Sequence, residues 1–473
     1  MGRKRKVSVF AAAVCGILLG IVELTIADDT GLNMKNIDFT GYGAYQDNDI
    51  VKGALGAWSL NHYWSHEVLL SVGFDARLSS NFSLCAAVEG DMWNPYPNAE
   101  AGPSAEAVEQ QYSFWIREAE GTYWLGEKEN PWFSVTAGYF PYKYDPEVRN
   151  LGEYLFRSYT YPGLIFNNFD FPAARVLGAK VSLQGAIAPD ITVKNDLLVT
   201  EEDATWPFGD FSITDVADIN FGKVIDFGAG VDFANYISVN SGITTPQASF
   251  NELLVDSAGI GVPAAPKITS YTDNTGQIHY DTTYNYYTFK AIKPMGRITL
   301  DPKPLLGDFG NLLSPEDLKV YGEFCVIGTQ NQSYWYESLT QRTPRMAGIY
   351  LPTFKLLDML NFECEYYPFP YSTSNSLLIN PQPDNNQNNV VVPVPAWSST
   401  EGVDGANPGY AIKDAAWRWS MYVKKTILPG VALTVQCARD RERLNVCGGY
   451  QNNPEVLVLP GEWAWSAKIA ASL

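Results

Sequence analysis

Two stretches decide the fold of this chain: FSVTAGYF at residues 133–140, and VLGAKVSL at residues 176–183. In each, apolar side chains alternate with small or polar ones, which is the two-residue period of a β-strand with one apolar face. Residues 141–173, between them, show no period. The pattern predicts a strand, a long irregular arch and a second strand. A soluble sheet turns its apolar face to a core, whereas a membrane barrel turns that face to lipid.

The N-terminus is typical of a secretory signal. Four basic residues at positions 3–6 precede an apolar run over residues 7–26, which ends in Thr25-Ile26-Ala27. Small residues at the last and third-last positions favour cleavage after Ala27. The alternative, a membrane anchor helix, is disfavoured by Glu23 inside the apolar run. We therefore expect a signal peptide over residues 1–27 and a mature chain over residues 28–473.

Charge and hydropathy exclude several classes of protein. Residues 1–27 carry four basic and one acidic side chain, so the net charge falls from −19 for the whole chain to −22 for the mature part. Such a chain is not a nucleic-acid binder that relies on a basic surface. After Ala27 no apolar run is long enough for a membrane-spanning helix. Closed β-barrels also satisfy all backbone groups in lipid, and their strands are only half apolar.

Alternation recurs along most of the mature chain, for example over residues 82–91, 227–233, 318–327, 360–367, 417–424 and 431–438. Short and long connections between these segments mostly alternate, whereas an all-β sandwich shows no such bias. The sequence therefore predicts an antiparallel up-and-down barrel of about 16 strands, within a range of 14 to 18, with short periplasmic turns and long extracellular loops. The weakest predicted strands are 211–221, where the period slips, and 284–300, which Pro294 interrupts. The connection after Leu300 is too long for the expected short turn.

Aromatic residues favour the membrane barrel. In this layout Tyr366 ends an outward strand, while Trp417, Trp419, Trp463 and Trp465 begin inward strands, so all lie at one height, as in a membrane-interface girdle. The last strand, with Trp463, Trp465, Ala467, Ile469, Ala471 and Leu473 on one face, resembles the C-terminal strand of outer-membrane β-barrels. That family usually ends in Phe or Trp, and Leu473 departs from this. The segment GYFPYKY, residues 138–144, also resembles porins, including phosphate-selective types, in which a long loop folds into the barrel after a strand.

Enzymatic signatures are weak. The three histidines are His62, His66 and His279, and the sequence contains neither GxSxG nor HExxH. A barrel enzyme would need His62 or His66 near a serine and a carboxylate at the rim. The cysteines show no CxxC spacing, although Cys437 and Cys447 could meet near one loop. We expect no enzyme, no cofactor and no metal.

The arch carries the candidate functional residues. A charged and aromatic loop suits an aqueous lumen, where opposed charges at a constriction sort solutes by charge. The candidates are Lys143, Asp145, Glu147, Arg149, Glu153 and Arg157, with Lys180 on the following strand. The alternative is an outer loop packed on the rim. Acidic residues outnumber basic ones at the expected inward positions, which are Glu89, Asp91, Lys180, Lys194, Asp196, Asp226, Asp232, Lys319, Glu323, Glu363, Glu365, Arg418 and Lys424.

These features predict an outer-membrane porin-like channel for small hydrophilic solutes, with a modest preference for cations. The expected partners are the lipid bilayer and small hydrophilic solutes, with no nucleic acid, and the resemblance to porins is compatible with a homotrimer. The alternative is a surface adhesion or glycan-binding barrel with a plugged lumen. It draws on the polar, turn-rich loop over residues 371–410, where Trp397 could stack on a sugar.

Overall fold

The computed structural model describes residues 37–52, 54–55, 58–59, 63–93, 111–156, 174–201, 211–237, 253–255, 261–263, 267–272, 277–283, 291–326, 328–329, 339–366, 372–373, 378–379, 390–391, 395–396, 417–439 and 463–472. The expected signal peptide, Arg157 and Cys447 lie outside these ranges. Within them, no helix has the length and apolar character needed to cross a membrane.

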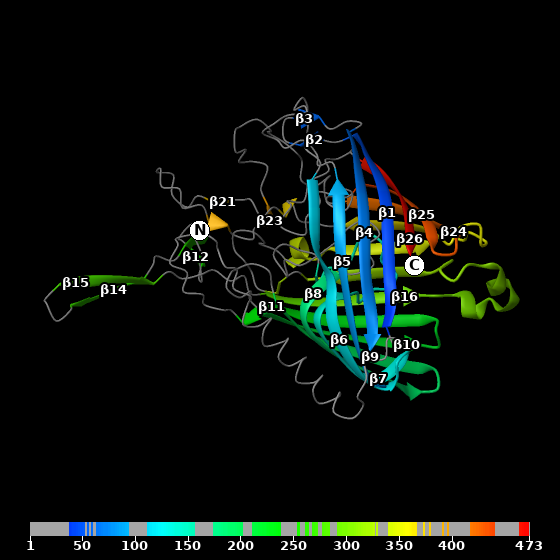
Figure 1. Ribbon diagram of the computed structural model, residues 1–473, viewed down its shortest axis with the longest axis horizontal. Helices are drawn as coiled ribbons and strands as arrows, with labels where there is room; N and C mark the ends of the chain where they lie inside the picture. Colours follow the sequence, from blue (N-terminus) through cyan, green and yellow to red (C-terminus); the bar gives the residue numbers. More distant parts are fainter. Residues whose placement is uncertain are drawn as a thin grey trace.

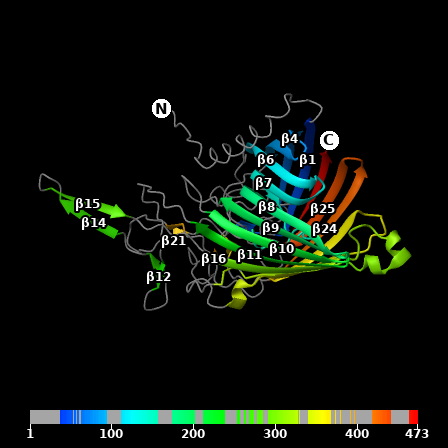
Figure 2. The ribbon, with the colours of Figure 1, turned by 90° about the horizontal axis from the view of Figure 1, so that it is seen from below.

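Sixteen antiparallel strands form one closed barrel, shown in Figures 1 and 2. Each strand pairs with its neighbour along the chain, and the barrel closes where β1 pairs with β26, from Tyr42 opposite Ser472 to Lys52 opposite Trp463. In order, they are β1 (Ile37–Lys52), β4 (Tyr63–Arg77), β5 (Phe82–Trp93), β6 (Gln111–Glu127), β7 (Asn130–Tyr142), β8 (Ala174–Ala188), β9 (Ile191–Glu201), β10 (Phe211–Phe221), β11 (Ile225–Ile237), β16 (Ala291–Leu300), β17 (Val320–Cys325), β18 (Arg345–Tyr350), β19 (Met359–Tyr366), β24 (Trp417–Leu428), β25 (Val431–Arg439) and β26 (Trp463–Ser472). The predicted all-β barrel of about 16 strands is confirmed.

Smaller elements lie in the connections. Two-stranded sheets are formed by β2 (Ala54–Leu55) with β3 (Trp58–Ser59), β12 (Leu253–Val255) with β13 (Gly261–Pro263), β14 (Lys267–Thr272) with β15 (Ile278–Thr283), β20 (Ser372–Thr373) with β23 (Pro395–Ala396), and β21 (Leu378–Ile379) with β22 (Val390–Val391). Three 3-10 helices are η2 (Lys303–Leu305), η3 (Gly307–Leu312) and η4 (Leu339–Arg342).

Both weakly predicted segments are barrel strands. β10 is paired along its length with β9, from Phe211 to Phe221. In the second segment, β16 is described from Ala291 to Leu300 and contains Pro294, and residues 284–290 lie outside the described residues. Pro294 lies at the end of the ladder to β17. The last paired residue of β16 is Met295, and the Pro294 carbonyl still accepts the Val326 N–H at 2.9 Å although the proline has no N–H to donate.

The connections at the two ends of the barrel differ. At one end they span residues 78–81, 128–129, 189–190, 222–224, 301–319, 351–358 and 429–430. At the other end they span 53–62, 94–110, 143–173, 202–210, 238–290, 326–344, 367–416 and 440–462. The first set is called the short-turn end here. Residues 301–319, which contain η2 and η3, are the long member of that set.

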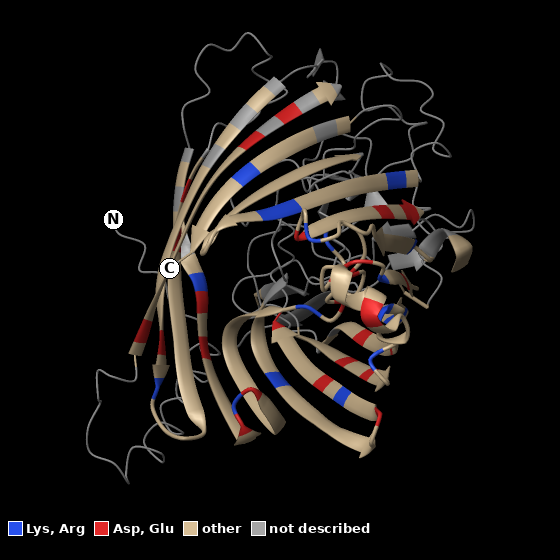
Figure 3. Cartoon of the chain, turned by 90° about the vertical axis from the view of Figure 1, so that its right-hand side faces the viewer, with Lys and Arg blue, Asp and Glu red and all other residues tan. Residues whose placement is uncertain are grey.

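The barrel has the polarity of a membrane protein. Along β19 and β24, Phe362, Trp417 and Met421 are exposed on the outside, while Glu363 and Arg418 are buried on the inside. The same alternation runs along β17 and β18. Figure 3 marks the charged positions along the ribbons. An exposed apolar outer wall with charges on the inner wall is stable when lipid surrounds the barrel, so this is a transmembrane barrel.

Candidate functional site

The arch leaves the end of β7 and lies against the inner wall of the barrel over residues 143–156. Its backbone turns sharply at Gly152 and Glu153, whose φ angles are +96° and +55°. A Cβ atom at position 152 would lie 3.1 Å from a carboxylate oxygen of Glu323 on β17. Glycine is therefore required there, because it accepts the positive φ and lets the backbone approach the wall.

Glu363 on β19 is the main anchor of the arch. Its buried carboxylate accepts backbone N–H groups from Arg149, Asn150 and Leu151, at N–O distances of 2.6, 2.9 and 2.8 Å. The Tyr321 hydroxyl donates to the same carboxylate at 2.6 Å. Hydrogen bonds to an ionised acceptor are the stronger kind, so this one side chain fixes three consecutive residues of the arch.

Glu323 on β17 holds the next turn of the arch. Its carboxylate accepts the backbone N–H groups of Glu153 at 2.6 Å and Tyr154 at 2.9 Å, and the Tyr144 hydroxyl at 2.5 Å. A third wall carboxylate, Glu365, accepts the Tyr154 hydroxyl at 2.8 Å. Three carboxylates from two nearby strands therefore bind the arch, mostly through its backbone.

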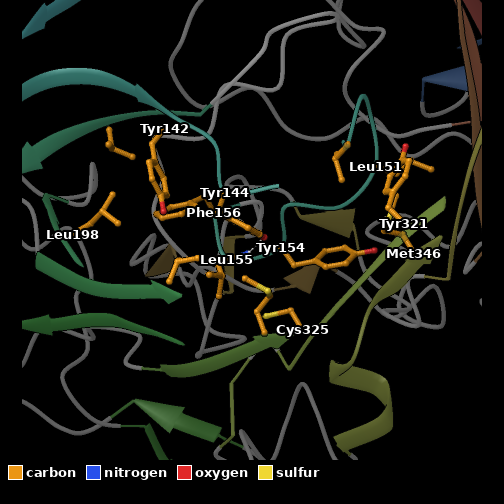
Figure 4. Packing of buried hydrophobic residues seen from close by; sticks show 14 of the residues in the cluster. Tyr142, Tyr144, Leu151, Tyr154, Leu155, Phe156, Leu198, Tyr321, Cys325 and Met346 are labelled. Atoms are coloured by element: carbon orange, nitrogen blue, oxygen red, sulfur yellow. Dashed lines mark hydrogen bonds between the residues drawn. The ribbon is translucent and has the colours of Figure 1, made fainter. Parts of the chain in front are cut away.

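Apolar side chains fill the space between the arch and the wall, as Figure 4 shows. The buried cluster joins three groups of side chains. From the arch come Tyr144, Val148, Leu151, Tyr154, Leu155 and Phe156; from β7–β11 come Phe140, Tyr142, Val176, Leu198, Val216 and Ala234; and from β16–β18 come Met295, Tyr321, Cys325, Met346 and Tyr350. The arch thus has an apolar core of its own inside a polar-lined barrel, and this core adds to the hydrogen bonds in fixing its position.

Three predicted candidates lie at the start of the arch. The Lys143 ammonium donates to the Val148 carbonyl at 2.5 Å. Asp145 is buried and accepts the Glu147 N–H at 3.2 Å. Glu147 forms an ion pair with Lys319 at 3.1 Å, and its backbone carbonyl accepts the Tyr350 hydroxyl at 2.6 Å.

Two further candidates, Arg149 and Glu153, lie in the anchored part of the arch. The Arg149 guanidinium lies 5.5 Å from the ring centroid of Tyr350, in a cation–π contact. A carboxylate oxygen of Glu153 accepts the Asp145 N–H at 3.3 Å. The five described arch candidates therefore occupy one short segment against one side of the wall. Lys180 lies on β8, with its ammonium over the rings of Phe140 and Tyr142.

Burial shifts the charge states in the arch. It raises the pKa of Asp145 to about 7, from a usual value of 3.8. It also raises the pKa of Glu147, although the Lys319 ammonium opposes this shift. Burial lowers the pKa of Lys143. Desolvation favours the neutral form of each group, so the net charge of the arch varies with pH near neutrality.

Sequence reasoning placed Glu323, Glu363 and Glu365 on the inner wall but did not identify them as anchors. It missed Lys293 and Arg297 on β16. Lys293 is buried, donates to the Leu155 carbonyl and lies 3.7 Å from Asp232. Arg297 forms ion pairs with Asp218 at 2.5 Å and Asp226 at 3.1 Å. The alternation of β16 would have placed both side chains inside, had Pro294 not obscured the strand.

The two described histidines, His66 and His279, are not part of the arch. His66 on β4 contacts the Asp47 carboxylate, and the Tyr45 hydroxyl at 3.3 Å. His279 lies in the β14–β15 hairpin, and His62 lies outside the described residues. Among the described residues, no group of acidic, histidine and cysteine side chains could hold a metal ion.

A closed 16-stranded antiparallel barrel, apolar outside and charged inside, is the architecture of the porins. The chain therefore has a porin-like fold. A scan of protein-family models and a search of curated proteins give no match.

Solved structures match the fold of this chain. Pseudomonas putida OprB is 10% identical, with 96% of this chain and 97% of that chain covered, at a TM-score of 0.46. Salmonella typhi OmpF is 9% identical, with 92% and 97% covered, at 0.43. A variant of the Rh. blastica porin is 8% identical, with 92% and 100% covered, at 0.39.

Proposed function

We propose that this protein is a channel for the passive diffusion of small hydrophilic solutes across the outer membrane, and that the arch forms its constriction. The observation that carries the proposal is the fixed position of a charged segment, residues 143–153, against one side of a charged inner wall. A rigid charged loop inside a barrel narrows the path for solutes and imposes a local field on it. The other predictions on this point are that residues 157–173 continue the arch, that Arg157 contributes to it, and that the barrel forms a homotrimer.

We further propose a modest preference for cations. On the inner wall, acidic side chains outnumber basic ones. The acidic ones are Asp75, Glu89, Asp91, Glu118, Glu120, Asp196, Asp218, Asp226, Asp232, Glu323, Glu363 and Glu365, and the basic ones are Arg117, Lys180, Lys194, Lys293, Arg297, Arg418, Lys424 and Lys468. The summed field of such a wall raises the local concentration of cations. Several of these acids are paired, as Lys194 is with Asp196 at 2.8 Å, so the preference is modest.

One observation favours the second candidate, a binding barrel with a plugged lumen. Inner-wall side chains at the height of the arch are almost fully buried, including Tyr422 and Gln436 on β24 and β25 as well as the anchors themselves. A wide water path would leave more of this wall exposed. The two candidates differ in conduction, because only the channel passes ions.

The test is conductance of the refolded protein in a planar bilayer under a salt gradient. We expect steady openings with a reversal potential of cationic sign. Glu120 and Lys180, both half-buried on the inner wall, provide a matched pair of variants. Glu120→Gln should weaken the cation preference and Lys180→Gln should strengthen it. Folded, heat-modifiable protein that stays silent would refute the channel and favour the plugged barrel.

A further inference from the structure

The connection between β16 and β17, residues 301–319, is an exception among the turns at its end of the barrel. Five of the other six connections there have two to four residues, and the remaining one spans 351–358. Figures 1 and 2 show residues 301–319 projecting past the ends of the strands, with η2 and η3 drawn as coiled ribbons. Residues 301–319 and 351–358 together are called the platform below.

The platform is built as one unit around Asp317. The buried carboxylate of Asp317 accepts the backbone N–H groups of Ser314 at 2.8 Å, Thr353 at 3.1 Å and Phe354 at 3.3 Å. The Thr353 hydroxyl donates to the same carboxylate at 3.1 Å. Lys355 donates to the Asn311 carbonyl at 2.7 Å, which joins the two segments a second time. The polar groups of the platform therefore largely form hydrogen bonds with one another.

The outer side of the platform is apolar. Leu305 and Leu356 are 73% and 77% exposed, and Leu306, Phe309, Leu312, Leu351 and Phe354 are exposed as well. Single exposed apolar residues are ordinary, but seven on one small, rigid unit form a patch of the kind that is normally covered. The polar groups of the platform bond internally and its large apolar groups point outward. This arrangement suits contact with an apolar neighbour.

The position of the patch indicates that neighbour. Leu300, Val320 and Ile349, the last outward residues of β16, β17 and β18, are exposed in the lipid-facing belt of the barrel. The platform begins directly after these residues, and Leu351 continues the outer face of β18. The apolar patch thus follows directly on the surface that meets lipid tails, and the layer that follows the tails in a bilayer is the headgroup layer, about 5–8 Å thick.

We propose that the platform is an interfacial anchor that inserts its leucine and phenylalanine side chains into the headgroup–acyl boundary of the leaflet at the short-turn end. The exposed Asp308 and Lys355 have opposite charges, so apolar burial drives the insertion and a zwitterionic phospholipid suffices. A polybasic anchor, by contrast, would need anionic lipid. This proposal does not depend on whether the barrel conducts.

The test uses the full mature chain, refolded into phosphatidylcholine nanodiscs. A fluorophore is attached at Phe309→Cys or Leu312→Cys, with Asp308→Cys as the matched control on another side of the same 3-10 helix, in a background where the native cysteines are replaced. All three positions are exposed, so labelling does not disturb packing. Doxyl groups near the headgroup should quench the fluorophores at 309 and 312 about twofold, and iodide in water should quench the one at 308.

Equal quenching of all three positions by iodide, with none by doxyl lipid, would overturn the anchor and leave the patch for a soluble partner. Hydroxyl-radical footprinting of the unmodified chain in the same nanodiscs is independent of the labels. There, Leu305 and Leu356 should be oxidised no faster than lipid-facing Leu300. Faster oxidation of either residue would also overturn the proposal.

Discussion

Replacing Glu363 with glutamine should release the middle of the arch while the barrel stays folded. The side chain keeps its size, but one of its two acceptor oxygens becomes an amide NH₂ group, which cannot accept from a backbone N–H. One oxygen accepts from Arg149 and Tyr321, and the other accepts from Asn150 and Leu151. Depending on how the amide turns, Glu363→Gln loses either the bond from Arg149 or the bonds from Asn150 and Leu151, and the bonds that remain no longer go to a charged acceptor.

The magnitude follows from the kind of bond. A hydrogen bond to a charged group contributes about 1.5 kcal/mol or more, so the loss of at least one such bond and of the acceptor's charge for the others amounts to about 3 kcal/mol. At about 1.4 kcal/mol per factor of ten, the population of the released arch rises by about two orders of magnitude. The 16-stranded ladder keeps its backbone bonds, so the barrel itself should not unfold.

Amide hydrogen exchange with mass spectrometry measures the release directly. The peptide covering residues 149–154 should exchange about a hundredfold faster in Glu363→Gln, while peptides from β24 to β26 keep their protection. Glu120→Gln is the control, because it removes the same charge from the inner wall at a half-buried position on β6. If exchange over 149–154 is the same in both variants and in the parent, Glu363 does not anchor the arch.

Three further predictions concern the arch, the wall and the strands. Burial raises the pKa of Asp145 to about 7 from 3.8, so the folded state binds this proton more tightly than the unfolded state does. Stability should therefore fall from pH 4 to pH 7. Asp145→Asn should flatten part of that decline in heat-modifiability assays. Arg297→Ala leaves two carboxylates without their cation and should cost about 3–5 kcal/mol in urea unfolding, whereas Lys425→Ala, which breaks an exposed pair, should cost less than about 1 kcal/mol. Gly138→Ala should sharply reduce the fraction of protein that folds into micelles, because the residue has a φ of +129° and a Cβ would lie 2.2 Å from a β6 carbonyl oxygen. The control Gly185→Ala should fold normally, because the space around that position is open.

The alternation of apolar and polar residues was sufficient to predict the barrel and its number of strands. It was weakest at β10 for a physical reason. Val216 points inward to the cluster beneath the arch, while Asp215 lies on the opposite face and accepts a hydrogen bond from Asn195 at 2.8 Å. The usual order of apolar outside and polar inside is reversed at these two neighbours, so the period slips in the sequence although the strand pairs with β9 along its whole length.

The arch could be predicted as a segment but not as a structure. Its charged residues were recognisable because an aperiodic stretch between two clear strands stands out. Its anchors were not, because Glu363 and Arg149 are 214 positions apart, and local patterns carry no information about such contacts. The platform was noticed only as a connection too long for its place, since its organisation depends on Asp317 meeting a second turn, 351–358.

The way the arch is bound has a consequence for protein engineering. Glu363 and Glu323 bind backbone N–H groups at five arch positions, and every residue except proline offers the same N–H. Among these positions the half-buried Arg149 can therefore be exchanged without loss of its backbone hydrogen bond, whereas Leu151 and Tyr154 must stay in the buried cluster and Gly152 is retained for its positive φ. The hydrogen bond that holds position 149 does not depend on the side chain there, so a set of variants at this one position could be screened for altered conductance on an unchanged wall.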